Sequence, residues 1–214
     1  MAKEPKSNVI EKRAVTAGVV EVRAAAEDGQ ESRTIEGYAA LYSEPTEIWT
    51  DWWEQIEPGA FDGADLEDVR CLFNHGASAI VGRSKSGTLV IALDDKGLKY
   101  RCEVANTTAG NDLLESVRRG DIDQSSFAFR VAESEWIENY NGQEGVWLRK
   151  ITKIAVVRDV SPVTYPAYEG TSVDARSLPD FPGEAPDPNT QDQTPKSPFS
   201  ARFADDISFY TTRL

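Results

Sequence analysis

The stretch Thr88–Val104 reads TLVIALDDKGLKYRCEV, and its pattern decides the fold class. An apolar run is followed by the turn-forming residues Asp94-Asp95-Lys96-Gly97, and then by apolar and polar residues in alternation. Because successive side chains of a strand point to opposite faces, this alternation is typical of a half-buried strand. The stretch is therefore predicted to be a β-hairpin in which Thr88–Leu93 pairs with Leu98–Val104.

The same period of two continues through most of the chain, with turn residues between the runs. Glu135–Ile137 and Val146–Val157 flank a loop that contains Asn141-Gly142, which predicts a second hairpin. Short runs of this kind favour a barrel or a sandwich over alternating strand–helix units. The residues alone therefore predict a β-rich fold.

Two segments depart from this period. Thr108 can cap a helix over about Ala109–Arg119, which carries apolar residues on one face and has Gly120 just beyond its end. Glu44–Ala60 holds three tryptophans beside several acidic residues and has no clean period. For this segment the sequence leaves two alternatives open, a long loop or an irregular helix.

Length and composition predict how the chain is divided. The 214 residues correspond to one domain with appended segments, and the 40% of hydrophobic residues suffice for a core. Six of the eleven prolines lie in the last forty residues, among Asp, Gln, Thr and Ser. We predict a flexible N-terminal segment at 1–13, a compact domain at 14–174 and a Pro-rich disordered tail at 175–214. Aromatic residues return from Phe199 to Leu214, so this end is either a docking peptide or a frayed terminus.

The charge balance excludes several classes of partner. Lys plus Arg number 23 against 36 Asp plus Glu, a formal net charge of -13, which repels nucleic-acid phosphates and anionic lipids. No apolar run approaches the roughly 18 residues of a membrane span, and the first residues lack the apolar stretch of a signal peptide. We therefore expect a soluble cytosolic protein with no nucleic-acid and no membrane partner. Cys71 and Cys102 lie in strand-like stretches and are expected to be buried free thiols.

His75 is the only histidine of the chain, which limits the possible chemistry. Zinc sites need three or four His or Cys ligands at characteristic spacings, and these are missing, as are the glycine-rich phosphate loops and the Gly-x-Ser-x-Gly motif. We therefore predict no metal and no cofactor. The turn triplet Asn74-His75-Gly76 follows an apolar strand. Such a histidine is most often a surface residue, but it is also the side chain best suited to act as a base near neutral pH.

Residues Gly120–Val131 read GDIDQSSFAFRV and lead from the predicted helix into a strand. Phe127 and Phe129 share one face of that strand, whereas Ser126 and Ala128 share the other. If the aromatic face is buried, Ser126 stands on an accessible face, with space beside the small Ala128. A serine there is usually only a solvated hydroxyl, but it becomes a nucleophile when a base such as histidine removes its proton.

The stretch Ile154–Val163 is a buried type of strand that acquires a carboxylate, Asp159, shortly before Pro162. A carboxylate at this point could hold an imidazole in one tautomer, as the third member of a Ser-His-Asp triad does. It could equally form an ion pair with Arg158 or end the strand in solvent. From the residues alone these alternatives stay open.

Seven short motifs occur in a fixed order along the chain. They are Gly37-Tyr38-Ala39-Ala40, Glu54–Phe61, Asn74-His75, Gly82-Arg83 with Ser86–Leu89, Arg119-Gly120-Asp121, Ser126–Phe129, and Asp159–Val163 with Pro166-Ala167. In this order they resemble the motifs of the tailed-phage prohead proteases, the serine proteases of capsid maturation. The resemblance covers about Arg33 to Thr171, and an ordered set is far more specific than any one motif.

The resemblance implies a catalytic set of His75, Ser126 and Asp159. Two residues depart from the family pattern: Ala128 stands where a glycine is common, and Asp159 where glutamate is usual, so the carboxylate must come closer to His75. The implied fold is α+β but β-rich, a small β-barrel ringed by a few helices, as in the herpesvirus assemblins. Those relatives use a second histidine as third member, which this chain does not have.

The function implied is a serine endopeptidase that acts inside the immature capsid, the prohead, in the host cytoplasm. It would cut scaffold or the N-terminal scaffolding segment of the coat protein, and then itself; a homodimer is left open. The alternative is a non-enzymatic capsid assembly factor of the same fold, which binds coat protein through the tryptophan-rich segment or the terminal aromatic peptide. A hydrolase of small substrates is disfavoured, because no pocket-forming or cofactor motif accompanies the three residues.

Overall fold

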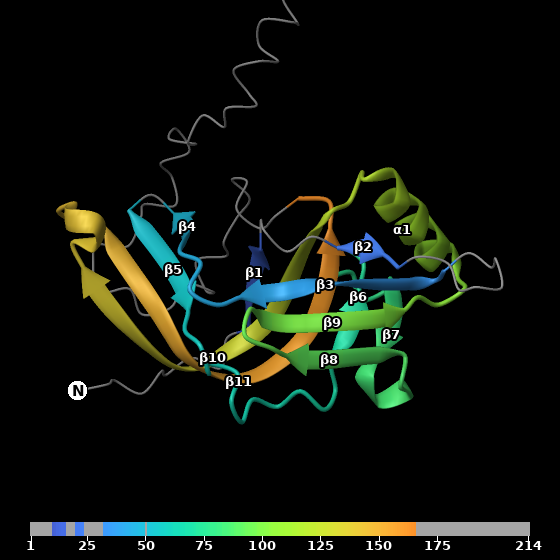
Figure 1. Ribbon diagram of the computed structural model, residues 1–214, viewed down its shortest axis with the longest axis horizontal. Coiled ribbons are helices and arrows are strands. Elements are labelled where there is room, and N and C mark those ends of the chain that lie inside the picture. Colours follow the sequence, from blue (N-terminus) through green and yellow to red (C-terminus); the bar gives the residue numbers. More distant parts are fainter. Residues whose placement is uncertain (1–9, 16–19, 24–31, 50, 166–214) are drawn as a thin grey trace, which may run out of the picture. The chain divides into compact units, whose positions relative to one another are not determined.

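The computed structural model describes residues 10–15, 20–23, 32–49 and 51–165. The predicted tail at 175–214 and its terminal peptide lie outside the described residues, as do the first nine residues. The strands and helices within the described part follow in chain order (Figure 1): β1 Glu11–Val15, β2 Glu21–Val22, β3 Thr34–Leu41, β4 Thr46–Trp49, β5 Trp52–Ile56, β6 Arg70–Leu72, β7 Ile80–Arg83, the 3-10 turn η1 Ser84–Ser86, β8 Leu89–Leu93, β9 Gly97–Glu103, α1 Thr108–Arg119, β10 Gln124–Glu138, the 3-10 turn η2 Tyr140–Gly142 and β11 Trp147–Val163.

These strands form two sheets. The larger sheet has the order β1-β10-β11-β5-β4, with β6 added to β11 and β7 added to β6. The smaller sheet has the order β2-β3-β9-β8, and β3, β9 and β8 run side by side across β10 and β11 (Figure 1). Both predicted hairpins are confirmed, since β8 pairs with β9 and β10 pairs with β11, each antiparallel.

The expected β-rich fold is confirmed, but not the small barrel ringed by a few helices. Strand pairing within the described ranges gives two open sheets and one α-helix, with no closed barrel. The reason lies in β10 and β11, which are long and carry several register shifts along their pairing, between Ala128 and Ser134 on the β10 side. Such bulges bend a strand pair, so the two strands curve past the smaller sheet and continue beyond it, where β11 pairs with β5.

The predicted helix is confirmed as α1, with one correction at its start. Thr107, not Thr108, is the N-cap, and its hydroxyl accepts a hydrogen bond from the Gly110 amide at 3.2 Å. The helix ends at Gly120, whose φ of 76° lies in the left-handed region that glycine adopts without strain. Thr107 and Thr108 can each cap a helix, so the sequence does not distinguish them. The backbone conformation shows that Thr107 is the cap.

The segment Glu44–Ala60 is neither a long loop nor an irregular helix. It contains the hairpin of β4 and β5, whose register turns around Asp51 at a φ of 64°. In β5 the buried residues alternate with half-buried ones, but Glu54 occupies a buried position. A charged residue on the inward face conceals the strand pattern in sequence, and ion pairs described below explain its burial.

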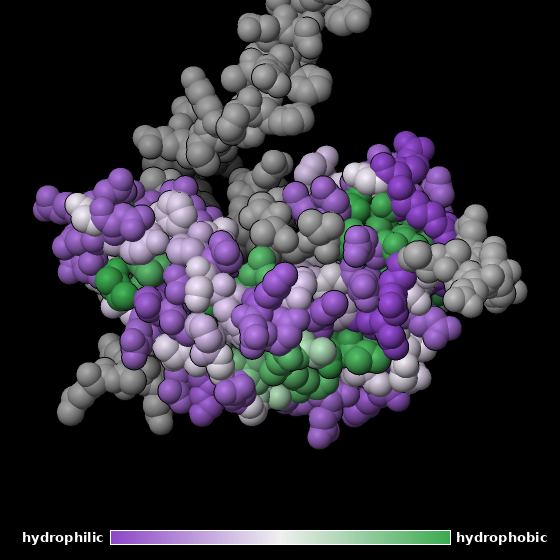
Figure 2. Space-filling view, in the orientation of Figure 1, coloured by the Kyte–Doolittle hydropathy of each residue, from purple (hydrophilic) through white to green (hydrophobic). Residues whose placement is uncertain are grey.

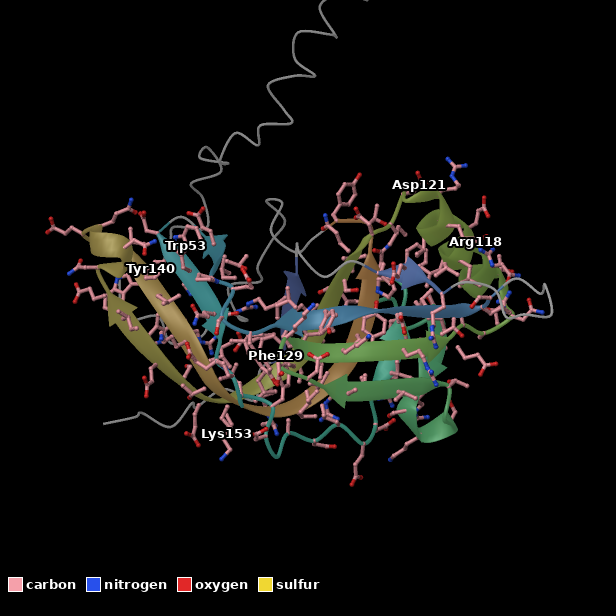
Figure 3. All side chains as sticks on the ribbon, viewed as in Figure 1. Trp53, Arg118, Asp121, Phe129, Tyr140 and Lys153 are labelled. Atoms are coloured by element: carbon pink, nitrogen blue, oxygen red, sulfur yellow. The ribbon has the colours of Figure 1, made fainter. Side chains whose placement is uncertain are left out.

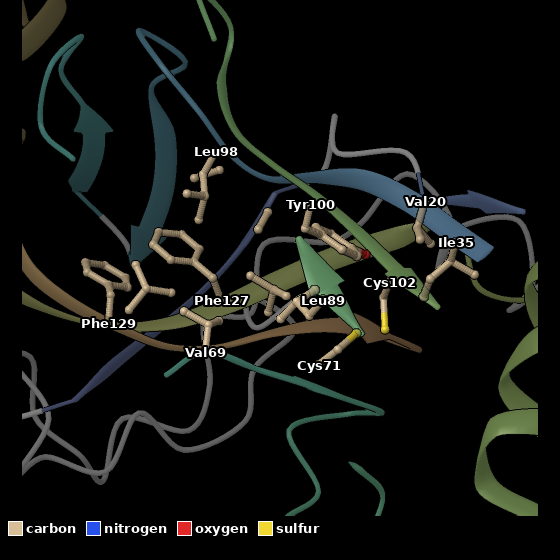
Figure 4. Packing of buried hydrophobic residues seen from close by; sticks show 14 of the residues in the cluster. Val20, Ile35, Val69, Cys71, Leu89, Leu98, Tyr100, Cys102, Phe127 and Phe129 are labelled. Atoms are coloured by element: carbon tan, nitrogen blue, oxygen red, sulfur yellow. The ribbon is translucent and has the colours of Figure 1, made fainter. Parts of the chain in front are cut away.

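The hydrophobic core lies between the two sheets and extends under α1 (Figure 4). Phe127 stacks on Phe129 with ring centroids 4.3 Å apart, and both rings are fully buried. Cys71 and Cys102 are buried free thiols, as predicted. The pKa of Cys71 is well above its usual value because its hydrogen bond with Cys102, and then burial, favour the neutral thiol.

Aromatic side chains gather where β10 and β11 meet β5, at the end remote from α1. Trp136 lies 5.5 Å from Trp52 and 6.4 Å from Trp147 between ring centroids. Trp53 and Tyr140 approach each other at 6.0 Å in the same region (Figure 3). The tryptophan-rich segment therefore packs within the fold rather than forming a free docking loop.

The face shown in Figure 2 is mostly polar, with apolar areas over β8 and beside α1 and a smaller one at the left end. Val90 and Leu93 of this strand are 49% and 40% exposed. Strand β1 begins at Glu11, within the segment predicted as flexible, and pairs with β10. No helix in the described ranges is long and apolar enough to cross a membrane.

Candidate active site

The central strands β10 and β11 place two of the three predicted residues on one face. Ser126 is directly opposite Ser161 in the antiparallel register, and Ala128 is opposite Asp159. Directly opposed residues of an antiparallel pair point to the same face, and alternation puts Ser126 and Ala128 together. The hydroxyl of Ser126 and the carboxylate of Asp159 therefore project from the same side of the sheet, separated by one small side chain.

The third residue, His75, reaches this face from the end of β6. That strand runs parallel to β11, with Cys71 opposite Val160, and the Asn74 amide continues the contact by donating to the Pro162 carbonyl at 3.0 Å. The side chain of Asn74 also bonds to Thr164, accepting from its amide at 2.8 Å and donating to its hydroxyl at 3.1 Å. The turn is thus fixed to the end of β11.

The backbone of this turn explains why a polar triplet follows the strand. Asn74 and His75 have φ angles of 53° and 54°, in the left-handed region that few residues other than glycine adopt. Such conformations persist where surrounding contacts hold them, and they concentrate at functional sites. Here the hydrogen bonds of Asn74 hold the turn, which directs the imidazole back over the sheet.

The three side chains form a continuous hydrogen-bonded chain. The distance from His75 Nδ1 to Asp159 Oδ1 is 2.6 Å, and that from His75 Nε2 to Ser126 Oγ is 2.7 Å. Ser126 is 1% exposed, and the side chains of His75 and Asp159 are 12% and 10% exposed. The residues singled out from sequence are all brought together, and the aspartate reaches the imidazole although glutamate is more usual at that position.

A second hydroxyl supports the carboxylate. Ser161, which is fully buried, donates to Asp159 Oδ1 at 2.7 Å. Hydrogen bonds to a carboxylate are among the stronger ones in proteins and fix its orientation. Sequence reasoning did not assign a role to Ser161, although it belongs to the Asp159–Val163 motif and lies on the Asp159 side of the strand by alternation.

The motif Gly82-Arg83 supports the neighbouring strand β7 rather than the chemistry. A side chain at Gly82 would collide with the Cys102 sulfur and with Thr88. Arg83 forms a two-pronged ion pair with Asp68, at 2.7 and 2.9 Å. That hydrogen-bonded pair lowers the pKa of Asp68 to about 2. The motif therefore fixes β7, which pairs with β6, and His75 follows the end of β6.

The sequence prediction of an accessible Ser126 is wrong, because the serine is only 1% exposed, and strand β1 pairs with β10 directly beside it. In the register, Ala14 is opposite Ser126 and Arg13 is opposite Phe127. The Ser126 hydroxyl lies 2.8 Å from the carbonyl oxygen of Arg13, to which it can donate. Alternation placed the serine on the correct face, but it could not show that a segment predicted to be flexible would pair with β10 beside it.

Next to this contact lies a buried cluster of four charged residues, two acidic and two basic. Glu54 accepts hydrogen bonds from Arg13 and, at 3.0 Å, from Arg149. Glu11 accepts from both arginines as well, at 2.6 and 2.7 Å. Burial alone would raise the pKa of Glu54, but the two guanidinium groups keep it below its usual value. The cluster thus holds two acidic and two basic side chains in direct contact.

Comparison with known protein families supplies the identity of this site. A family model described as Caudovirus prohead serine protease matches residues 19–182. The chain belongs to this family. The prohead protease resemblance read from seven motifs is therefore confirmed, and the chain is a serine protease of prohead maturation rather than a non-enzymatic assembly factor. No curated protein and no solved structure matches this prohead protease.

Proposed function

We propose that this chain is an endopeptidase in which Ser126 is the nucleophile, His75 the general base and Asp159 the residue that orients His75. The observation that carries the proposal is the hydrogen-bonded chain of 2.6 and 2.7 Å that joins the three side chains. Membership of a serine protease family supports it, because such enzymes need an activated serine. His75 is the only histidine in the sequence, so no other imidazole can serve as the base.

The reaction follows from these contacts. Ser126 Oγ attacks the carbonyl carbon of the substrate peptide bond while its proton passes to His75 Nε2, and the Nδ1–H donates to Asp159. His75 then gives the proton to the leaving nitrogen, which departs as an amine and leaves an acyl ester on Ser126. A water molecule attacks the ester as His75 takes its proton, and the acid is released when that proton returns to Ser126.

The family assigns the chain to capsid maturation, which implies interaction with capsid or scaffold proteins. We propose that it acts inside the prohead in the host cytoplasm, and that it cuts scaffold or the N-terminal scaffolding segment of the coat protein. Cleavage of its own terminal segments belongs to the same proposal, because chain ends enter a protease site as extended peptides more readily than the paired central strands do.

The test is coexpression of the full chain with its coat protein, followed by intact-mass analysis. Ser126→Ala should abolish processing of coat protein and of the chain itself, while the circular dichroism spectrum stays unchanged. The matched control is Ser125→Ala, which removes the neighbouring hydroxyl and should leave processing in place. Processing by Ser126→Ala, or its loss only in Ser125→Ala, would refute the assignment of the nucleophile.

A further inference from the structure

Strand β1 lies where a peptide substrate would have to lie. It pairs antiparallel with the beginning of β10, the strand that carries Ser126, and forms the edge of the larger sheet. Among its residues, Arg13 is the one whose carbonyl oxygen reaches the Ser126 hydroxyl, at 2.8 Å. An extended peptide that adds to a sheet edge is a common mode of peptide recognition. In this register, Arg13 is the residue before the bond that Ser126 would attack.

The buried charged cluster divides into a part from β1 and a part from the body of the protein. Glu11 and Arg13 belong to β1, and they share one face because they are two positions apart on a strand. Glu54 on β5 and Arg149 on β11 belong to the body, and they are 4% and 2% exposed. The Arg13 guanidinium contacts Glu54 with both Nε and Nη2. It also lies 5.8 Å from the ring centroid of Phe129.

We propose that β1 holds the place of the substrate strand, and that Glu54 and Arg149 select the substrate by charge. The selected peptide carries a basic residue directly before the cleaved bond and an acidic residue two positions earlier, as Glu11-Lys12-Arg13 does. This inference rests on the proposed function of Ser126 and names the specificity of the same site.

The charge balance of the cluster explains why both positions matter. Without β1, Glu54 and Arg149 remain as one ion pair at 3.0 Å. A peptide with Glu and Arg two positions apart restores two acidic and two basic groups, which is the balanced state seen with β1. A peptide with only one of these charges would bury a net charge, and a buried charge without a partner is strongly unfavourable. Selection therefore acts on the pair.

Strand β1 also keeps the site inactive while it is bound. The hydroxyl of Ser126 has one proton and two neighbouring acceptors, His75 Nε2 and the Arg13 carbonyl oxygen. A hydroxyl that donates to Arg13 cannot donate to His75, and it faces the carbonyl oxygen instead of attacking the carbon. A substrate strand must therefore displace β1 before cleavage.

The test offers the full-length protein a complex mixture of peptides and maps every cut by mass spectrometry, with Ser126→Ala as the blank. We expect Ser126-dependent cuts after Arg or Lys, with Glu or Asp two positions before. Arg13→Ala should raise the rate of these cuts about tenfold or more, because it removes an ion-paired side chain that holds β1 in place.

Two matched variants separate specificity from general damage. Glu54→Gln should lower the preference for a basic residue before the bond about tenfold or more, and keep the preference for the acidic residue. Arg149→Gln should show the reverse pattern. Damage to the fold would instead lower all cuts alike, and such a uniform loss in both variants would contradict the assignment of the two residues.

The outcomes also distinguish this inference from the proposed function. Ser126-dependent cuts without the paired acidic and basic residues would overturn the inference and leave the protease assignment intact. A complete lack of Ser126-dependent cuts, in the unchanged protein and in Arg13→Ala, would overturn both.

Discussion

Ser125 and Ser126 are adjacent on β10, and a comparison of the two shows what makes a serine reactive. Both are buried, at 0% and 1% exposure, and both hydroxyls form a 2.7 Å contact with a ring side chain. They point to opposite faces, so Ser125 meets the Tyr100 phenol in the core and Ser126 meets the His75 imidazole. The partner, rather than burial or hydrogen bonding, separates them.

The two partners differ in what they can do with a proton. Burial holds the pKa of Tyr100 well above its usual value, so this phenol stays neutral and acts only as a structural hydrogen-bond partner. An imidazole can accept a proton near neutral pH and pass it on. The contact between Ser125 and Tyr100 on the core face of β10 therefore stabilises the fold. The contact between Ser126 and His75 on the other face can transfer a proton.

The largest effect is expected from removal of His75, the hydrogen-bond partner of Ser126. His75→Ala should lower kcat by about as much as Ser126→Ala, on the order of 10⁶-fold if the unit behaves like the subtilisin triad. The double variant should be little worse, because the two residues act as a unit. Single-turnover rates on a cleavable peptide measure this. Substantial cutting by His75→Ala at neutral pH would contradict the comparison.

A smaller effect is expected at Asp159, which acts on Ser126 only through His75. Asp159→Asn keeps the shape of the hydrogen bond but loses the charge that stabilises the imidazolium. The rate should fall by about three to four orders of magnitude, as for the chymotrypsin triad. Asp159→Glu should retain much more activity, since it restores the residue usual in the family.

Both Asp159 variants are measured with the same cleavage assay, and thermal unfolding serves as the control for folding. A nearly unchanged rate in Asp159→Asn would mean that Ser126 and His75 act as a pair, with Asp159 a structural acid.

The smallest effect is on the other face of β10. Ser125→Ala leaves the buried Tyr100 hydroxyl without its partner, which should lower the free energy of unfolding by about 1–3 kcal/mol. The activity per folded molecule should stay close to that of the unchanged protein. Tyr100→Phe together with Ser125→Ala removes both polar groups and should recover part of the loss. Denaturant unfolding measures both, and full stability in Ser125→Ala would contradict a structural role for this serine.

Much of the fold could be predicted from local patterns. The hairpins around Gly97 and around Asn141-Gly142 were predictable because turn residues separate alternating runs, and both exist. The hairpin in Glu44–Ala60 was not predictable, because Glu54 lies on the buried face and breaks the hydrophobic pattern. Its burial depends on Arg13 and Arg149, which are distant in sequence, so no window of the sequence contains the reason.

The three residues of the candidate site could also be predicted from local patterns, but their surroundings could not. His75, Ser126 and Asp159 each lie at a strand end or on a definable strand face, and motif order links them. Ser161 was missed although alternation alone places it on the Asp159 side of its own strand. The Arg13 carbonyl was missed because its role depends on register, in which β1 pairs with β10. Pairing partners of a strand are a tertiary property that periodicity does not contain.

The position of the tryptophans determines what an optical experiment on this protein would report. All five lie on β4, β5, the end of β10 and the start of β11, and the ring of Trp136 contacts those of Trp52 and Trp147. Asp159 lies near the other end of β11, and Ser126 is likewise at the opposite end of β10 from Trp136. Intrinsic fluorescence therefore records melting of the aromatic end of the long strand pair and is silent about the catalytic residues. A tryptophan placed at Ile10, which is 37% exposed beside β1, would give departure of that strand a signal of its own.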